Sequence, residues 1–245
     1  MKRFLCSIFA FLFLFNFALA DPLVLLEDYT GSVTESDSEG CTFDYSYRYP
    51  QVDEEGEGGN AVNVFFLDQM DYTESFTIPL LQETTEGIDC SVSITYDLTC
   101  NNDEFFSVLI RIEKTVSGKE PSVTWKGNSF SRLNPSYGST TTLPRMLGLL
   151  DISENNTWLE DRQTNKANEL VWDMVWDMIE KNTENIDFFP DLTRETLTYI
   201  FFPEEDFYLD ENGEPVFIIQ PDEAAPADFG LLRFPILLED ILDEM

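Results

Sequence analysis

The chain has 245 residues, no histidine and a formal net charge of −33, which results from 47 acidic and 14 basic side chains. This charge repels nucleic acid phosphates and anionic lipid surfaces, so we expect no nucleic acid partner. The absence of histidine removes the usual general base near neutral pH, the Ser-His and Cys-His nucleophile pairs, and imidazole metal ligands. The negative charge would attract cationic proteins. Alternatively, the acidic side chains serve only solubility or adaptation to a salty habitat.

The first twenty residues have the three parts of a secretory signal peptide. Lys2 and Arg3 are positive, residues 4–17 are mostly apolar, and residues 18–20 match the small-x-small cleavage pattern. The apolar run is shorter than the ~20 residues that a membrane-spanning helix needs. We therefore expect cleavage after Ala20 and a secreted or periplasmic chain without a membrane span. Loss of Lys2 and Arg3 would take the net charge to about −35.

The segment after the signal peptide predicts a leader, a strand and a helix. Residues 21–40 show no sustained hydrophobic period and are interpreted as a leader. Residues 41–49 alternate between aromatic and polar side chains, which predicts a half-buried strand closed by Pro50. Residues 60–75 favour a helix, and Pro79 is expected to end or kink it.

Three further strands are predicted before residue 131. Residues 90–100 alternate without a break, so Cys90 and Cys100 are expected on the same face of one strand. A hairpin connection leads to a strand over residues 105–113, and another strand is expected near residues 123–130.

Three cysteines remain after the signal peptide, which removes Cys6. An oxidising compartment predicts one disulfide and one odd thiol. An unbroken strand would separate Cys90 from Cys100 by roughly 33 Å, whereas a disulfide needs Cα atoms ~4.4–6.8 Å apart. Cys41 would therefore pair with Cys100 if its strand is antiparallel to the next one, or with Cys90 if it is parallel. Antiparallel pairs are commoner, which favours Cys41–Cys100.

The second half combines one strong helix with a β-rich end. Apolar side chains recur at helical spacing over residues 167–181, which predicts an amphipathic core helix. Trp172 and Trp176 are interpreted as core residues of this helix, and a sugar-stacking platform is the weaker alternative. The other expected elements are a short segment at 143–150, a hairpin of strands 207–209 and 216–219, a strand at 232–236, and a short acidic tail at 237–245 that could be helical.

These elements predict an α+β protein with antiparallel sheets, packed helices and two closely associated subdomains. The second subdomain is expected to pack the 167–181 helix on its sheet. The expected divisions are a signal peptide over 1–20, a leader over 21–40, an N-terminal α+β domain over 41–143 and a C-terminal α+β domain over 150–242.

Motifs in both halves occur in the order found in one known domain pair. The chain resembles the extracellular domain pair of RsiV-like, lysozyme-sensing anti-sigma factors, which also precedes PdaC-like peptidoglycan deacetylase domains. The motifs are Tyr49-Pro50-Gln51-Val52, Phe106-Ser107-Val108, Phe207-Tyr208-Leu209, Val216-Phe217-Ile218-Ile219, Pro221-Asp222-Glu223-Ala224-Ala225-Pro226, Gly230 and Phe234-Pro235-Ile236.

The resemblance implies a strand, a bend and a last strand, with lysozyme or another cationic envelope protein as the ligand. Pro226 and Pro235 would fix φ, and Gly230 would permit a positive φ. The resemblance to deacetylase partners implies peptidoglycan as the alternative ligand. Residues 118–122 lack the Gly-x-His-Pro-Asn turn that the family often carries. We recognise no sigma-binding segment and no deacetylase domain, so the module is expected to act alone.

No residue is singled out for catalysis, for a cofactor or for a metal. The sequence Asp210-Glu211-Asn212-Gly213 is interpreted as a hairpin turn, because the later glutamate of a calcium loop is missing. Three functions remain: a non-enzymatic binding module of the cell envelope that captures lysozyme or another cationic protein, a peptidoglycan-binding module, and a hydrolase that uses two carboxylates.

Overall fold

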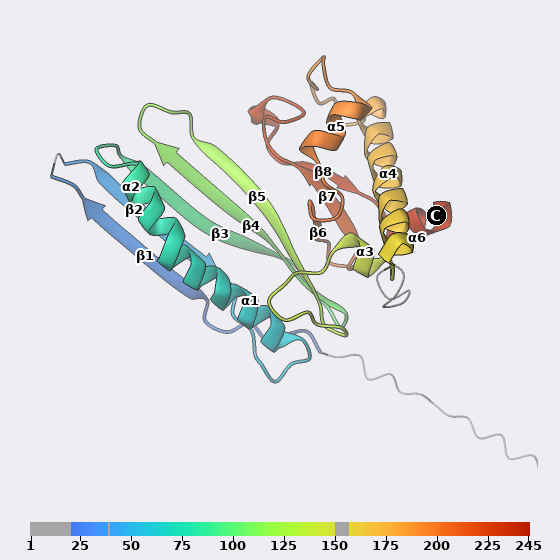
Figure 1. Cartoon of the computed structure of the whole chain (residues 1–245), viewed down its shortest axis with the longest axis horizontal. Coiled ribbons are helices and arrows are strands. Elements are labelled where there is room, and N and C mark those ends of the chain that lie inside the picture. Colours follow the sequence, from blue (N-terminus) through green and yellow to red (C-terminus); the bar gives the residue numbers. More distant parts are fainter. Residues whose placement is uncertain (1–20, 39, 150–156) are drawn as a thin grey trace, which may run out of the picture.

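The computed structural model describes residues 21–38, 40–149 and 157–245. It confirms the α+β prediction: helices pack on a five-stranded sheet and on a three-stranded sheet (Figure 1). The predicted signal peptide lies outside the described residues. Within them, no helix combines the length and the apolar character needed to cross a bilayer.

The five-stranded sheet has its strands in sequence order. All neighbouring strands are antiparallel except β2 and β3, which are parallel because a helical crossover joins them. The segment interpreted as a leader is part of this sheet, since it supplies the edge strand β1. The strands are β1 (Tyr29–Ser36), β2 (Thr42–Tyr49), β3 (Cys90–Asn101), β4 (Phe105–Val116) and β5 (Ser122–Ser131).

The crossover between β2 and β3 is helical along most of its length. Helix α1 (Gly59–Tyr72) agrees with the predicted helix, and a π-helical turn (Thr73–Thr77) links it to α2 (Ile78–Thr84). Pro79 lies in the first turn of α2, where its missing N–H is not needed. The π turn therefore lets the helical segment continue past the proline that was expected to end or kink it.

Aromatic side chains from the sheet and from α1 form the N-terminal core. Tyr49 stacks on Phe66 at 5.7 Å between ring centroids, and Phe65 meets Phe130 edge-on at 5.2 Å. Such pairs add to the stabilisation from burial. The strand β2 places its odd-numbered aromatic side chains on this face, as its alternating sequence predicts.

Cys90 and Cys100 lie on opposite faces of β3, contrary to the expectation. A β-bulge between Leu98 and Cys100 reverses the alternation. Cys90 therefore belongs to the N-terminal core, and Cys100 belongs to the C-terminal core.

The strand register contradicts the Cys41–Cys100 disulfide that antiparallel pairing favoured. Strands β2 and β3 are parallel with Phe43 opposite Cys90, so Cys41 lies at the Cys90 end of β3. Cys100 lies at the other end, where its thiol donates to the carbonyl of Phe105 at 4.0 Å.

The C-terminal part packs its longest helix on the three-stranded sheet, as expected. Val171, Val175 and Ile179 of α4 are buried in this core. Trp172 and Trp176 are partly buried against it. Its elements are α3 (Leu143–Met146), α4 (Thr157–Lys181), α5 (Arg194–Ile200), β6 (Phe207–Leu209), β7 (Pro215–Ile219), β8 (Leu232–Pro235) and α6 (Leu238–Glu244).

The two sheets meet where β6 crosses β5. A side chain at Gly127 would overlap the backbone carbonyl of Phe207, so this close crossing requires glycine. Nearby, the Ser107 hydroxyl accepts a hydrogen bond from the Leu209 N–H at 3.0 Å. The side-chain amide of Gln220 is bonded to both backbone groups of Trp125, so it closes part of the β5 edge.

Candidate binding pocket between helix α4 and the α5–β6 connection

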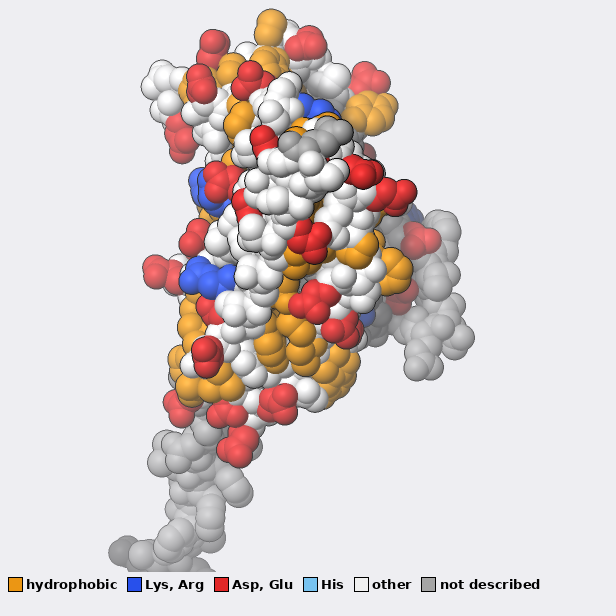
Figure 2. Space-filling view, turned by 90° about the vertical axis from the view of Figure 1, so that its left-hand side faces the viewer, with side chains coloured by type: hydrophobic (Ala, Val, Ile, Leu, Met, Phe, Trp, Pro, Cys, Tyr) orange, Lys and Arg blue, Asp and Glu red, His pale blue; other side chains and the backbone are white. Residues whose placement is uncertain are grey.

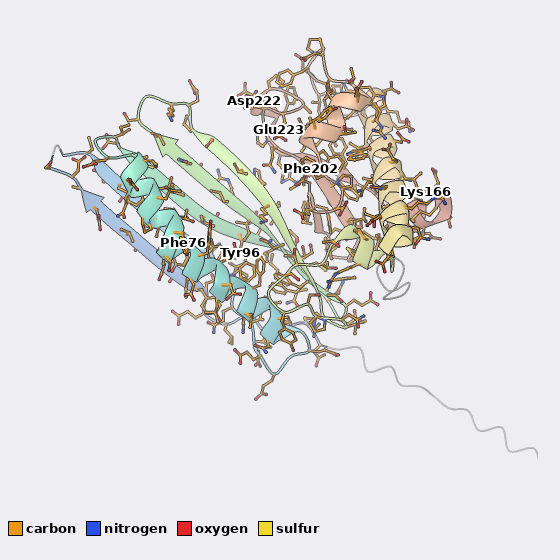
Figure 3. The ribbon with its side chains drawn as sticks, in the orientation of Figure 1. Phe76, Tyr96, Lys166, Phe202, Asp222 and Glu223 are labelled. Carbon is orange, nitrogen blue, oxygen red and sulfur yellow. The ribbon has the colours of Figure 1, made fainter. Side chains whose placement is uncertain are left out.

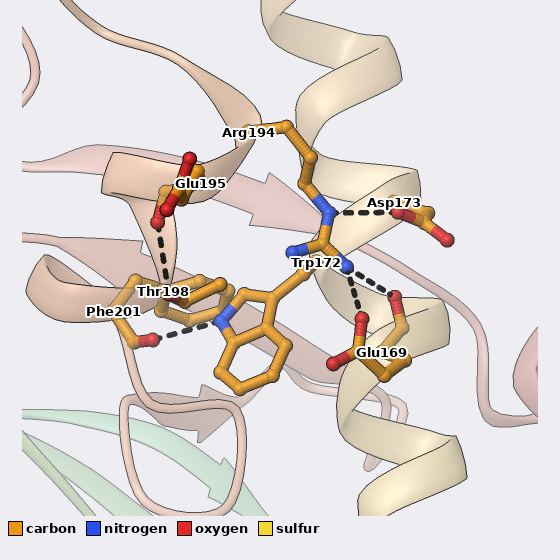
Figure 4. A network of polar contacts seen from close by, with 7 residues as sticks. All are labelled: Glu169, Trp172, Asp173, Arg194, Glu195, Thr198 and Phe201. Atoms are coloured by element: carbon orange, nitrogen blue, oxygen red, sulfur yellow. Dashed lines mark hydrogen bonds and ion pairs between the residues drawn. The ribbon is translucent and has the colours of Figure 1, made fainter.

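Trp172 connects α4 to the segment that leads into β6. Its indole N–H donates to the carbonyl of Phe201 at 2.9 Å, and the guanidinium of Arg194 lies 5.4 Å from the centre of its ring (Figure 4). Arg194 is also paired with Glu169 and Asp173, at 2.5 and 2.7 Å. These bonds fix the orientation of the Trp172 ring.

The connection from Phe202 to Asp206 is a closed turn. The Asp206 carboxylate accepts from the Phe202 N–H at 2.7 Å, and the Asp206 N–H donates back to the Phe202 carbonyl at 2.9 Å. Phe202 itself is 56% exposed. Figure 3 shows it on the side of the C-terminal part that faces the five-stranded sheet, near Glu223.

A cavity of about 440 Å³ lies between this turn and α4. Asn168 of α4 lies in its wall and is 7% exposed. The Asn168 Nδ2 donates to Glu204 at 2.8 Å, whereas Oδ1 has no hydrogen-bond partner among the described residues. The lining residues are Asn165, Asn168, Trp172, Phe202, Pro203, Glu204, Glu205 and Asp206.

Two carboxylates in and near this pocket are harder to ionise than usual. Burial raises the pKa of Asp206, and Glu205 adds to the rise, while the Phe202 N–H and Lys126 oppose it. Burial also raises the pKa of Glu223, and the charge of Asp206 contributes to that rise. The pocket therefore combines aromatic surface with closely spaced acidic groups.

The residues that the sequence predicted to shape the C-terminal bend lie away from this pocket's lining. Pro226 precedes a short 3₁₀ turn (Ala227–Phe229), Gly230 follows it with φ at +67°, and Pro235 ends β8. Asp210 accepts hydrogen bonds in the turn between β6 and β7, as expected for a hairpin. In the described residues, no group of three or more histidine, cysteine, aspartate or glutamate side chains is arranged to hold a metal ion.

The sequence interpretation did not identify Asn168, although a signal was present. Asn168 lies three residues before Val171 and seven before Val175, so it continues the apolar stripe of α4 with a polar side chain. A polar residue at a core-facing position is buried and needs partners. The sequence also predicted no helix or strand at the position of α5, the helix that supplies Arg194.

A second surface feature lies on the helical crossover of the N-terminal part. Tyr72, Phe76 and Leu80 recur at every fourth position and are each at least 60% exposed. The rings of Tyr72 and Phe76 stack at 5.4 Å between centroids. This row is apolar, whereas the pocket near Trp172 is acidic, so the two surfaces differ in chemistry.

No protein-family model matches the chain, and no curated protein matches it. Solved structures of the DUF3298 family are similar to it. One from Bacteroides fragilis has a TM-score of 0.54 and 13% identity, over 90% of this chain and 93% of its own. One from Pseudomonas aeruginosa has a TM-score of 0.53 and 11% identity, over 92% and 94%.

The chain has the DUF3298 fold. The likeness covers both sheets, since it extends over at least 90% of the chain. DUF3298 denotes a domain of unknown function. At these identities the comparison describes the architecture alone, and any ligand has to be inferred from the side chains of this protein.

Proposed function

We propose that this protein is a non-enzymatic binding module of the cell envelope, secreted or periplasmic, which captures a cationic protein. The observation that carries the proposal is the excess of acidic over basic side chains, 47 against 14. Figure 2 shows acidic side chains distributed over one face of the molecule, with few basic ones among them. Such a surface accelerates encounters with cationic partners and repels anionic ones.

Three features support this proposal. The signal-peptide pattern of residues 1–20 is consistent with export. The sequence motifs resemble RsiV-like lysozyme sensors, which makes a c-type lysozyme a suitable cationic probe. The pocket near Trp172 offers carboxylates and aromatic rings to a partner.

A peptidoglycan-binding module is the second candidate. It is favoured by one observation, the presence of Trp172 and Phe202 beside asparagine side chains in the same pocket. Aromatic rings pack on the apolar faces of sugars, and the amides can hydrogen-bond with hydroxyl groups.

Calorimetric titration of residues 21–245 with c-type lysozyme, at low and at moderate salt, separates these functions. Capture of a cationic protein predicts binding that weakens steeply with salt, because screening shortens the range of the attraction. Lysozyme with acetylated lysines is the matched control, since acetylation neutralises its lysine ammonium groups. Absence of binding at both salt concentrations would contradict a lysozyme ligand, and salt-independent binding of peptidoglycan fragments would favour the second candidate.

A further inference from the structure

The pocket near Trp172 contains a buried acceptor that lacks a donor. Asn168 lies in the pocket wall, and its almost fully covered Oδ1 has no partner among the described residues, while its Nδ2 donates to Glu204. A flipped amide would place oxygen against the carboxylate oxygen of Glu204, and a carboxylate only accepts, so chemistry fixes this orientation. An unsatisfied buried acceptor costs free energy. A ligand that brings an N–H or O–H donor to Oδ1 would remove this cost.

The surroundings of Oδ1 favour a positively charged donor. Three successive carboxylates, Glu204, Glu205 and Asp206, line the pocket, and its lining residues among the described part of the chain include no lysine or arginine. The exposed ring of Phe202 adds an aromatic surface, which attracts cations. A sugar hydroxyl could donate to Oδ1, but it would gain little from three carboxylates.

Three cations of the surrounding elements, among the described residues, interact with groups other than Asn168. Arg194 lies over Trp172 but is paired with Glu169 and Asp173. Lys126 lowers the pKa of Asp206 from its place on β5, against the larger effects of burial. The side chain of Lys166 bonds the carbonyls of Glu244 and Met245 at the C-terminal end. These contacts leave the Asn168 acceptor without a donor.

The geometry points to a site for the guanidinium or ammonium group of a basic side chain on the partner protein. The group would lie among the carboxylates of the 204–206 turn and would donate to Asn168 Oδ1 once the side chains that cover this buried oxygen shift. This inference rests on the proposed function for the class of partner, and it adds the chemical group that the pocket binds.

The first test uses small probes on residues 21–245, which contain every described element. N-acetyl-arginine amide is titrated while the indole N–H signal of Trp172 is followed by NMR; the signal is assigned by its loss in W172F. N-acetyl-citrulline amide is the matched control, because its side chain has nearly the same shape and no charge. We expect saturation by the arginine probe at roughly millimolar concentration and at least about tenfold weaker binding of the citrulline probe. Equal binding of the two probes would overturn the inference.

The second test uses two variants with the same change in net charge. E205Q removes a carboxylate from the pocket, and E211Q removes an exposed carboxylate from the β6–β7 turn. We expect E205Q to weaken binding of the arginine probe about threefold to fivefold, and E211Q to leave it unchanged. An equal response of both variants would mean that overall charge alone attracts the probe, which contradicts a site in this pocket.

The third test changes the acceptor itself. N168L keeps a side chain of similar size and removes Oδ1, so the arginine probe should bind about tenfold more weakly. Thermal unfolding of N168L shows whether the variant is folded, and E205Q provides the test independently of that result. A chitobiose titration that shifts the Trp172 signal more than the arginine probe does would assign the pocket to sugars.

The outcomes separate this inference from the proposed function. If E205Q and E211Q bind lysozyme equally well, the partner uses another surface. The proposal that the protein captures a cationic partner would then hold, and the inferred site in the pocket would be wrong. If lysozyme does not bind but the arginine probe does, lysozyme is excluded as the partner and the pocket retains its ligand class.

Discussion

Two buried asparagines show how the N-terminal and C-terminal parts of the molecule differ. Asn63 of α1 is 1% exposed, and both ends of its amide are bonded to the backbone of Val52, at 3.0 and 2.8 Å. Asn168 of α4 is 7% exposed and, within the part of the chain that the structure describes, only the Nδ2 end of its amide is bonded. The amide of Asn63 therefore has hydrogen-bond partners at both ends within the protein. The second amide leaves an acceptor of a pocket residue without a donor among the described residues, and the ligand site that we propose therefore lies in the C-terminal part.

The same contrast holds for two arginines. Arg132 is 1% exposed and donates to the backbone carbonyls of Glu57, Asn102 and Asp21, so it ties two loops of the N-terminal part to the segment that precedes β1. Arg194 bonds carboxylates near the surface of α4. Buried donors in the N-terminal part therefore stabilise the fold, whereas the arginine of the C-terminal part orients a pocket residue.

The largest effect is expected from R132M. This variant leaves three backbone carbonyls without their donor, so the free energy of unfolding should fall by about 3–5 kcal/mol. R194M breaks exposed ion pairs and should cost about 1 kcal/mol or less. Urea unfolding of both variants, followed by tryptophan fluorescence, measures the difference. Equal losses would show that Arg132 has no special role in holding these three backbone segments.

A paired substitution tests the two asparagines directly. N63L leaves both backbone groups of Val52 buried and unpaired, and it should reduce the free energy of unfolding by about 2–4 kcal/mol. N168L removes an acceptor that has no donor among the described residues, and it also removes the hydrogen bond from Nδ2 to the partly exposed Glu204. These two effects oppose each other, so we expect a change within about 1 kcal/mol. A larger loss for N168L than for N63L in urea unfolding would contradict the distinction between the two parts.

Substitution of Gly127 should weaken the contact between the N-terminal and C-terminal parts. G127A places a Cβ against the Phe207 carbonyl, so it should cost about 1–3 kcal/mol through overpacking. S122A, at an exposed position of the same strand, is the control and should change stability by less than about 0.5 kcal/mol. Hydrogen exchange of the β5 and β6 amides would show whether the loss is local to the crossing.

Much of the fold could be predicted because alternation and helical spacing report which side chains face a core. The alternation of 41–49 predicted β2, and the apolar stripe of 167–181 predicted most of α4. The parallel direction of β2 and β3 could also have been inferred from the sequence. A helix was expected between these strands, and a helical crossover is what parallel neighbours require.

The remaining features depend on contacts between distant residues. The bulge that turns Cys100 to the other face is not visible in its alternating sequence. The leader interpretation failed because β1 gains its order from pairing with β2, not from a hydrophobic period of its own. The pocket requires Asn168 and Glu204 to meet across 36 positions of sequence, and only the packing of α4 on the α5–β6 connection brings them together.

The smallest expected effect concerns the pH dependence contributed by Asp206 of the C-terminal part. Burial raises its pKa above the ordinary 3.8, so the folded state binds this proton more tightly than the unfolded state does. The stability that protonation contributes is fully present below pH 3.8 and is lost as the pH rises through the folded-state pKa. D206N keeps an acceptor for the Phe202 N–H and removes the charge, so it should unfold at a higher temperature than the wild type near pH 7.

The advantage of D206N should shrink as the pH falls through the folded-state pKa of Asp206 toward 3.8, and it should be absent below pH 3.8, where the wild-type carboxyl is protonated in both states. D243N removes the same charge from an exposed position and controls for the repulsion within a chain of net charge −33. Thermal unfolding between pH 3 and pH 7 distinguishes the two variants. If D243N stabilised the protein as much as D206N at every pH, general repulsion between acidic groups would explain both effects. Burial of the ionised Asp206 would then carry no free-energy cost of its own, and a basic ligand would have none to reduce.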